Sequence, residues 1–138
     1  LKEIMEKVKR PCVRYTEATA ENVSKADCLI IDCYGLLSSI YRYGEISYIG
    51  GGFGVGIHNV LEAAVYGIPV IFGPNNKKFR EAQHLLEKKG GFEINDYEEF
   101  KRLMDRFLTD NSYLQQAGNA AVKNNSGALE KIMKAIRL

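Results

Sequence analysis

The sequence has few cysteines and no pattern that would pair them. Cys12, Cys28 and Cys33 are an odd set, with no CxxC pair and no histidine cluster nearby. A disulfide framework and a zinc site are therefore both unsupported. We expect three reduced thiols in a cytosolic protein, and we expect no metal.

An excess of one charge and a long apolar run are also missing. The 19 Lys and Arg residues nearly balance the 17 Asp and Glu residues, and the two signs are interleaved, which argues against a nucleic-acid partner. The least polar stretch, Val55 to Gly73, contains His58, Glu62 and Pro69. A membrane span would exclude these residues, so we expect a soluble chain.

The chain begins at Leu1 without a signal-peptide composition. An amphipathic pattern over Leu1–Lys9 predicts that it starts inside a helix. Its 138 residues, 46% of them hydrophobic, suit one globular domain with a real core. We expect a single, partial domain over residues 1–138, cut from a longer protein.

Hairpin signals are absent, and strand and helix patterns alternate instead. Strands are predicted at Cys12–Tyr15, Cys28–Ile31, Ile46–Ile49, Pro69–Phe72 and Phe92–Ile94. After Leu1–Lys9, helices are predicted at Leu36–Tyr43, at Asn59–Tyr66, from the turn at 73–76 to Lys89, and from Asp96 to about Leu108, with further helix broken near 124–127. This alternation predicts an α/β fold, a parallel sheet with helices on both faces.

Local signals refine this prediction. The continuous apolar run Cys28–Ile31 is typical of a strand covered on both faces. Thr19 is placed to cap a short turn through Ser24, and Gly67 to end a helix in the left-handed conformation. Asp96 with Glu99 makes a capping box.

Ligands of parallel sheets bind beyond the carboxyl ends of the strands, here in the loops 32–36, 50–59 and 73–79. Five glycines crowd the second of these loops, yet no register gives GxGxxG, and Ile57-His58 replaces the Lys-Ser/Thr of a P-loop. A bare loop that leads into a helix still favours an anion site. The alternative is a tight connection that needs positive φ.

Asn59 and Glu62 allow two interpretations. They are spaced as a capping box, or Glu62 accepts hydrogen bonds from ribose hydroxyls beside the anion site. His58 either donates to the same phosphate or packs in the loop.

The residues of the two flanking loops also allow more than one interpretation. Asp32 suits a helix cap, and Gly35 a turn. Lys77, Lys78 and Arg80 form either a solvated face or contacts to an anionic ligand. No Ser-His-Asp order or close carboxylate pair is present, so we assign no catalytic residue to this chain.

Several blocks, taken together, resemble one family. They are D-x-x-G-x-L at 32–37, Y-I-G-G at 48–51, G-x-H-N-x-L-E at 56–62, G-I-P-V at 67–70 and G-P-x-x-x-x-F-R-E at 73–81. In order and spacing they are similar to the 3-deoxy-D-manno-octulosonic acid (Kdo) transferases of lipopolysaccharide synthesis. Members of that family have two Rossmann-like domains in the GT-B arrangement, and this chain resembles part of the carboxyl-terminal, donor-binding domain.

The resemblance implies CMP-Kdo as donor substrate, lipid A precursor as acceptor, inversion at the anomeric carbon and no cofactor. It also implies a parent enzyme on the cytoplasmic side of the bacterial inner membrane. The implied donor-binding residues are Gly35, Gly51, Gly52, Gly56, His58, Asn59 and Glu62. The family's proposed base is a glutamate of the amino-terminal domain, so the isolated chain is expected to be inactive.

The chain departs from the family pattern at Leu36, Ile57, Val60 and Lys78, so contacts to the sugar are expected to differ in detail. We also expect it to lack the first two strands of its domain. Their loss would separate the strand at 12–15 from its neighbours, and the open edge at 28–32 should invite direct re-pairing or a homodimer. The alternative functions are a GT-B domain that uses a UDP-sugar and a non-catalytic nucleotide-binding or interaction module.

Overall fold

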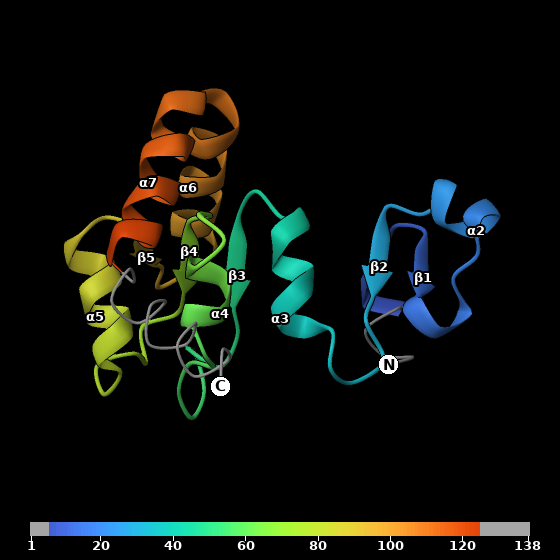
Figure 1. Ribbon diagram of the computed structural model, residues 1–138, viewed down its shortest axis with the longest axis horizontal. Coiled ribbons are helices and arrows are strands. Elements are labelled where there is room, and N and C mark those ends of the chain that lie inside the picture. Colours follow the sequence, from blue (N-terminus) through green and yellow to red (C-terminus); the bar gives the residue numbers. More distant parts are fainter. Residues whose placement is uncertain (1–5, 125–138) are drawn as a thin grey trace, which may run out of the picture. The chain divides into compact units, whose positions relative to one another are not determined.

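The computed structural model describes residues 6–124. The chain divides into two compact units, Leu1–Ile40 and Tyr41–Leu138 (Figure 1). Every described strand pairs in parallel with its neighbour. The predicted α/β class is therefore confirmed, and each unit is described on its own below.

The first unit is built around a two-stranded sheet. Its elements are β1 (Cys12–Arg14), a 3-10 turn at Tyr15–Glu17, α2 (Ala20–Ser24), β2 (Cys28–Ile30) and α3 (Leu37–Ile40). β1 and β2 pair directly, with Val13 opposite Leu29. The first strand is therefore not left separate, and the direct re-pairing predicted for the open edge at 28–32 is the arrangement found.

The prediction that the second strand is covered on both faces is wrong for the described structure. The Leu29 side chain in the middle of β2 is 44% exposed, whereas Val13 opposite it on β1 is only 8% exposed. The apolar run identified the strand correctly. However, the described short helices of this unit leave the middle of β2 half-exposed.

The amino-terminal end of α2 is capped by Thr19, as predicted. The Thr19 hydroxyl accepts the N–H of Asn22 at 3.2 Å, and the Asn22 side chain accepts the N–H of Thr19 at 2.7 Å. At the start of the chain, Glu6 and Lys7 are helical. Val8 and Lys9 are not helical, so the first helix predicted over Leu1–Lys9 ends earlier than expected. Its residues 1–5, and the part of the break predicted at 124–127 that follows Asn124, lie outside the described residues.

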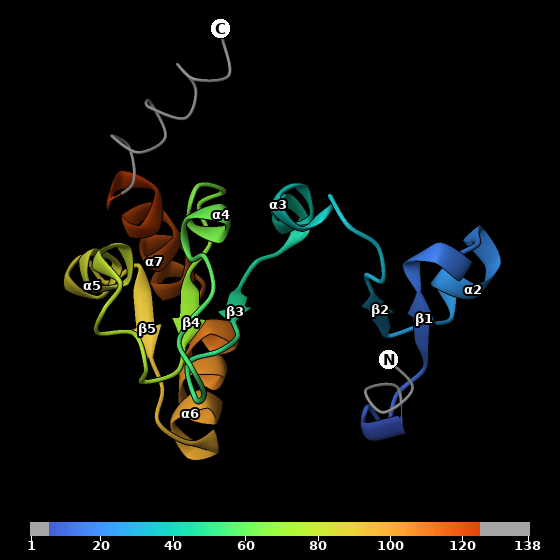
Figure 2. The same cartoon turned by 90° about the horizontal axis from the view of Figure 1, so that it is seen from below.

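The second unit holds a three-stranded sheet in the order β3, β4, β5 (Figure 2). Its strands are β3 (Ser47–Ile49), β4 (Val70–Phe72) and β5 (Gly91–Glu93). Its helices are the 3-10 turn η2 (Tyr41–Tyr43), α4 (Leu61–Ala64), α5 (Arg80–Glu87), α6 (Tyr97–Thr109) and α7 (Asn111–Asn124). α4 and α5 lie on one side of the sheet and α6 on the other (Figure 2).

The centre of this unit is β4, which is buried on both faces. Val70 and Phe72 face a cluster that includes Ala64 and Leu85 of α4 and α5. Ile71 faces the opposite cluster, with Phe107 of α6. All three β4 residues have no exposed surface, and each such side chain contributes about 1.5–3 kcal/mol through burial. A sheet with helices on both faces, predicted from the sequence, is therefore confirmed here.

Helix ends depart from the prediction in ways that have local causes. The helix predicted at 59–66 is reduced to α4, because the Asn59 side chain accepts the N–H of Leu61 at 2.9 Å and makes a turn. Gly67 has φ 74°, as predicted. α5 ends at Glu87 rather than Lys89, and the left-handed residue is Lys89 itself, with φ 64°.

Close packing of α7 explains two glycines, Gly90 before β5 and Gly118 in α7 itself. A Cβ on Gly90 would lie 2.4 Å from the backbone nitrogen of Ala121 in α7, and one on Gly118 of α7 would lie 2.2 Å from the carbonyl oxygen of Gly67. Backbones approach closely at both points, so the glycines are required for packing.

The capping box of α6 is modified: Asp96 accepts the N–H of Glu99 at 2.8 Å, while Glu99 accepts the N–H of Asn95 at 2.7 Å.

Candidate functional site

Two of the three predicted ligand loops meet at the carboxyl ends of the parallel strands. The N–H of Asn75 donates to the carbonyl of Gly52 at 2.8 Å, and the N–H of Ile57 donates to the carbonyl of Asn75 at 3.3 Å. The loop after β3 and the loop after β4 are therefore joined by their backbones. The third loop, 32–36, belongs to the first unit and is described with it.

Close backbone packing explains part of the glycine run. Gly51 has φ 92°, and a Cβ there would lie 2.1 Å from the carbonyl oxygen of Gly56. A Cβ on Gly52 would lie 2.4 Å from the nitrogen of Gly73. In contrast, the nearest atom to a Cβ on Gly54 is 3.8 Å away. Gly51 and Gly52 are therefore needed by the fold, whatever else they contact.

Three N–H groups of the glycine loop donate to carbonyls within the loop. Gly54 and Gly56 both donate to the carbonyl of Gly51, at 3.0 and 3.1 Å, and His58 donates to the carbonyl of Gly50 at 3.1 Å. In addition, α4 spans only four residues, so its dipole is small. These three N–H groups are therefore used within the loop and are not left free for a phosphate.

A hollow of about 370 Å³ lies beside the end of this loop. It is lined by Ile57, His58, Asn59, Val60, Leu61, Phe79 and Glu81. His58 and Asn59 are exposed at its surface. Because the Asn59 oxygen is held by Leu61, the amide NH₂ of Asn59 remains to donate to a ligand. Two of the predicted donor residues thus share one concave surface.

Glu62 lies one turn further along, in α4. The predicted capping box is not formed, since Asn59 bonds to Leu61 instead. Within residues 6–124, the Glu62 carboxylate has no hydrogen-bond or ion-pair partner. Its charge acts on the phenol of Tyr41, whose pKa is raised first by burial and then by Glu62. The carboxylate therefore keeps its acceptor positions open.

The loop after β4 is fixed by a buried amide. Asn76 has no exposed surface, and its side chain donates to the carbonyl of Gly73 at 2.9 Å and to Glu93 Oε1 at 2.8 Å. Lys77 Nζ lies 3.0 Å from the same oxygen. Hydrogen bonding from Asn76, then from Lys77, holds the pKa of Glu93 below its usual range. This arrangement locks the loop onto the end of β5.

Of the three predicted anion contacts, Lys77 is thus paired with Glu93. Lys78 and Arg80 are exposed, and in the part of the chain that the structure describes neither has an ion-pair partner. Arg80 is the first residue of α5, beside Glu81 of the hollow. These two cations are available to an anionic ligand, whereas Lys77 would first have to leave Glu93.

In the first unit, Asp32 joins the ends of the two strands. Its carboxylate accepts the Thr16 N–H at 3.0 Å and the Thr16 hydroxyl at 2.6 Å. These bonds from Thr16 lower the pKa of Asp32. The helix-cap interpretation of Asp32 is therefore wrong. Gly35 has φ 90° and nothing within 4 Å of a Cβ position, so it serves a turn with open space around it.

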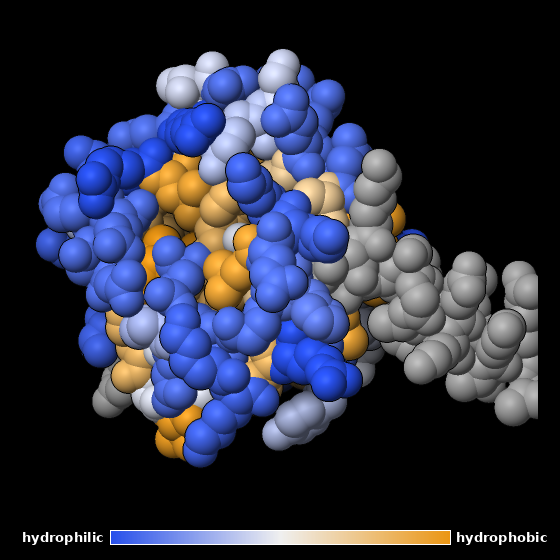
Figure 3. Space-filling model, turned by 90° about the vertical axis from the view of Figure 1, so that its left-hand side faces the viewer, coloured by the Kyte–Doolittle hydropathy of each residue, from blue (hydrophilic) through white to orange (hydrophobic). Residues whose placement is uncertain are grey.

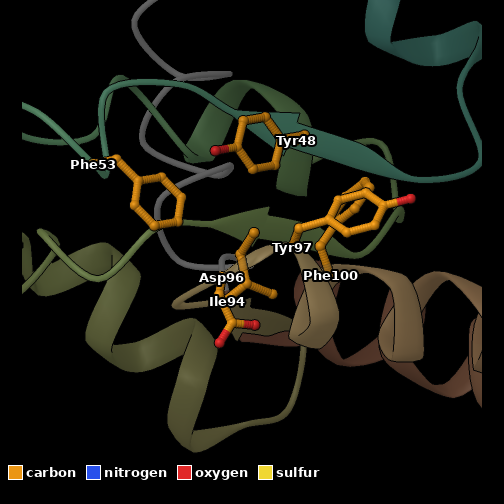
Figure 4. A pocket seen from close by; sticks show the side chains of 6 residues that line it. All are labelled: Tyr48, Phe53, Ile94, Asp96, Tyr97 and Phe100. Carbon is orange, nitrogen blue, oxygen red and sulfur yellow. The ribbon is translucent and has the colours of Figure 1, made fainter.

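Sequence reasoning missed an aromatic hollow of about 410 Å³. Figure 4 shows the rings of Tyr48, Phe53, Tyr97 and Phe100 around Ile94, while the carboxylate of Asp96 points away from them. Tyr48 and Phe100 meet edge to face, with centroids 6.1 Å apart. Alternation along β3, where Ser47 and Ile49 are buried and Tyr48 is exposed, was the available signal.

A larger hollow of about 610 Å³ follows the free side of β5 between α5 and α6. Apolar side chains such as Leu86, Phe92 and Leu103 line it together with Arg102 and Arg106. Figure 3 views the molecule from this side and shows apolar surface enclosed by hydrophilic residues. The hollow contains none of the predicted donor residues.

Residues 6–124 contain neither a metal-binding cluster nor a membrane-spanning helix. No group of three or more His, Cys, Asp or Glu side chains is arranged to hold a metal ion. No described helix is both long enough and apolar enough to cross a membrane.

No family model matches the chain. Curated relatives do match it. The 3-deoxy-D-manno-octulosonic acid transferase of Aquifex aeolicus is 37% identical over 87 residues, which is 62% of this chain and 25% of the relative. The enzyme of the same name from Rickettsia felis is 31% identical over 116 residues, 80% of this chain and 25% of the relative. The chain thus spans about a quarter of the length of these relatives.

A solved structure matches the fold. It is the carboxyl-terminal CMP-Kdo-binding domain of WaaA from Acinetobacter baumannii, with a TM-score of 0.78 and 19% identity over 89% of this chain and 65% of that one. The matched fold is the α/β architecture described above. This chain is therefore a relative of the 3-deoxy-D-manno-octulosonic acid transferases, and its fold is that of this carboxyl-terminal domain.

Proposed function

We propose that this chain is the donor-binding part of an inverting glycosyltransferase that moves Kdo from CMP-Kdo to lipid A precursor, at the cytoplasmic side of the bacterial inner membrane. The observation that carries the proposal is the kinship with named Kdo transferases, together with the fold of a CMP-Kdo-binding domain. By resemblance, we also propose that no cofactor takes part and that CMP is the leaving group of the donor.

Three groups support a role in donor binding. His58 and the Asn59 amide are exposed at one hollow and can donate to a phosphate or a sugar hydroxyl. Glu62 offers a carboxylate without a protein partner, which suits two ribose hydroxyls. Lys78 and Arg80 add positive charge from the neighbouring loop and helix start.

Glycines contribute to the proposed site in a different way. Gly51 and Gly52 set the backbone path of the loop by close packing, and Gly56 continues it towards His58. We propose that they shape the donor surface rather than supply a ring of free N–H groups. Gly35 is proposed to lie beside the donor by resemblance alone.

The chemistry of transfer needs a base, and the resemblance assigns it to the amino-terminal domain. We therefore propose that the isolated chain binds donor nucleotide but does not turn over CMP-Kdo on lipid A precursor. Product formed by the isolated chain would contradict this part of the proposal.

Titration calorimetry with CMP, UMP and UDP tests the proposed donor. We expect CMP to bind most tightly, and Glu62→Gln to weaken CMP binding about 10-fold or more, since hydrogen bonds to a charged group contribute about 1.5–3 kcal/mol. Glu87→Gln, at the far end of α5, is the matched control and should bind like the parent chain. Tighter UDP binding would favour a UDP-sugar enzyme, and an absence of binding would favour the non-catalytic module.

A further inference from the structure

Two of the three cysteines face each other across the sheet of the first unit. Cys12 begins β1 and Cys28 begins β2, and the register of the parallel pair places them directly opposite. Neighbouring strands lie about 4.8 Å apart. Disulfide-bonded cysteines have Cα atoms about 4.4–6.8 Å apart, so the backbone already has the required spacing.

The two thiols also interact. Burial raises the pKa of the Cys12 thiol, and the neighbouring Cys28 thiol raises it further. Cys12 Sγ additionally donates to the carbonyl of Arg10 at 3.3 Å. Both cysteines are free and half-buried, so a small reagent can reach either sulfur.

Cys33 differs from this pair. It follows Asp32, beyond the end of β2, and it has no cysteine opposite it in the register. Among residues 6–124 no cluster of metal ligands includes the pair. Cys12 and Cys28 are therefore a pair of thiols opposite each other, and Cys33 serves as an unpaired thiol for comparison.

We propose that Cys12 and Cys28 form a redox modification site, in which a small-molecule disulfide oxidises them to a bond between β1 and β2. One thiolate attacks a sulfur of the oxidant and releases the first small thiol. The second thiolate then attacks the mixed disulfide and releases the second small thiol. The two cysteines lose two protons and two electrons, and the oxidant is reduced to two thiols.

The bond would act where the first unit is weakest. Its sheet has two strands, and the middle residue of β2 is 44% exposed. A covalent link between the strands restricts the unfolded chain and so favours the paired state. The redox state of the surroundings would then set the stability of this unit.

The test uses the full chain equilibrated with oxidised and reduced glutathione. After acid quenching and unfolding, N-ethylmaleimide labels the remaining thiols, and mass spectrometry counts and maps them. We expect free thiols to fall from three to one, with Cys33 labelled and a Cys12–Cys28 cross-link. Cys33→Ser should keep the cross-link, whereas Cys12→Ser and Cys28→Ser should each abolish it.

Repeating the oxidation in concentrated urea shows whether the folded register directs the bond. In an unfolded chain, Cys28 and Cys33 close the shorter loop and should dominate. The proposal is overturned if the native chain gives mainly a Cys28–Cys33 bond, only glutathione adducts, or only bonds between chains.

Discussion

The two parallel sheets of this protein start from similar strand sequences and end in different environments. β4 has a strand on each side, and its middle residue Ile71 has no exposed surface. β2 pairs with β1 in a two-stranded sheet, and its middle residue Leu29 is 44% exposed. Both were predicted as strands from continuous apolar runs.

The comparison separates two properties that an apolar run seems to report together. The run favours an extended conformation, which both segments adopt. Burial is supplied by other elements. α4 and α5 cover one face of β4, α6 covers the other, and α7 contributes side chains to the clusters on both faces. An apolar strand is therefore buried only as far as the rest of its unit can cover it.

The largest expected effect is the difference between alanine substitutions in the middle of β4 and in the middle of β2. Ile71→Ala should cost about 2–5 kcal/mol of unfolding free energy, because it leaves a cavity between closely packed layers. Leu29→Ala removes a half-exposed side chain and should cost about 1 kcal/mol or less. Urea unfolding combined with amide hydrogen exchange would assign each loss to its own unit.

Val13→Ala is a useful control in the first unit, because Val13 is buried opposite Leu29. It should cost more than Leu29→Ala while changing fewer atoms. Equal losses for Ile71→Ala and Leu29→Ala would show that β2 is as well covered as β4, against the exposure described here.

The next effect concerns the loop after β3. Gly52→Ala places a Cβ against the backbone of Gly73 and should destabilise the second unit by about 1–3 kcal/mol, because overpacking forces the backbone to shift. Gly54→Ala has room for its methyl group and should change stability little. Thermal unfolding of both variants measures the difference. Equal destabilisation would mean that the loop needs flexibility throughout rather than one close approach.

Much of the fold could be predicted from local sequence patterns. The strand positions, the parallel alternation and the Gly67 cap follow from apolar runs and glycine placement, which depend on neighbours in sequence. The family blocks were also readable, since they are short and ordered. Helix ends were less accessible, because a single side chain such as Asn59 can take a hydrogen-bond donor from the first turn.

The remaining features depend on contacts that no local pattern encodes. The buried Asn76 amide donates to Glu93 of β5, and the same Glu93 carboxylate pairs with Lys77 of the loop. The aromatic hollow combines β3, the glycine loop and α6. Gly52 was predicted as a ligand contact, and its close approach to Gly73 is visible only once two strand ends lie together.

The smallest effect compares two carboxylates at the ends of β2 and β5. Asp32 has a lowered pKa because of Thr16, and Glu93 because of Asn76 and then Lys77. A lowered pKa stabilises the folded state above the unfolded pKa, and this contribution is lost as pH falls through the folded pKa. Urea unfolding of Asp32→Asn and Glu93→Gln should therefore differ from the parent at pH 7, and the differences should shrink below about pH 4.

Glu93→Gln should show the larger difference at pH 7. The Glu93 side chain is only 24% exposed and is bonded to the buried amide of Asn76, whereas the bonds of Asp32 are exposed and more strongly screened by water. Thr16→Val removes the hydroxyl donor to Asp32 and should reproduce part of the Asp32→Asn effect in the first unit. A difference for Asp32→Asn that persists undiminished at pH 3 would instead assign the role of Asp32 to its shape, because a protonated carboxyl and an amide carry the same charge.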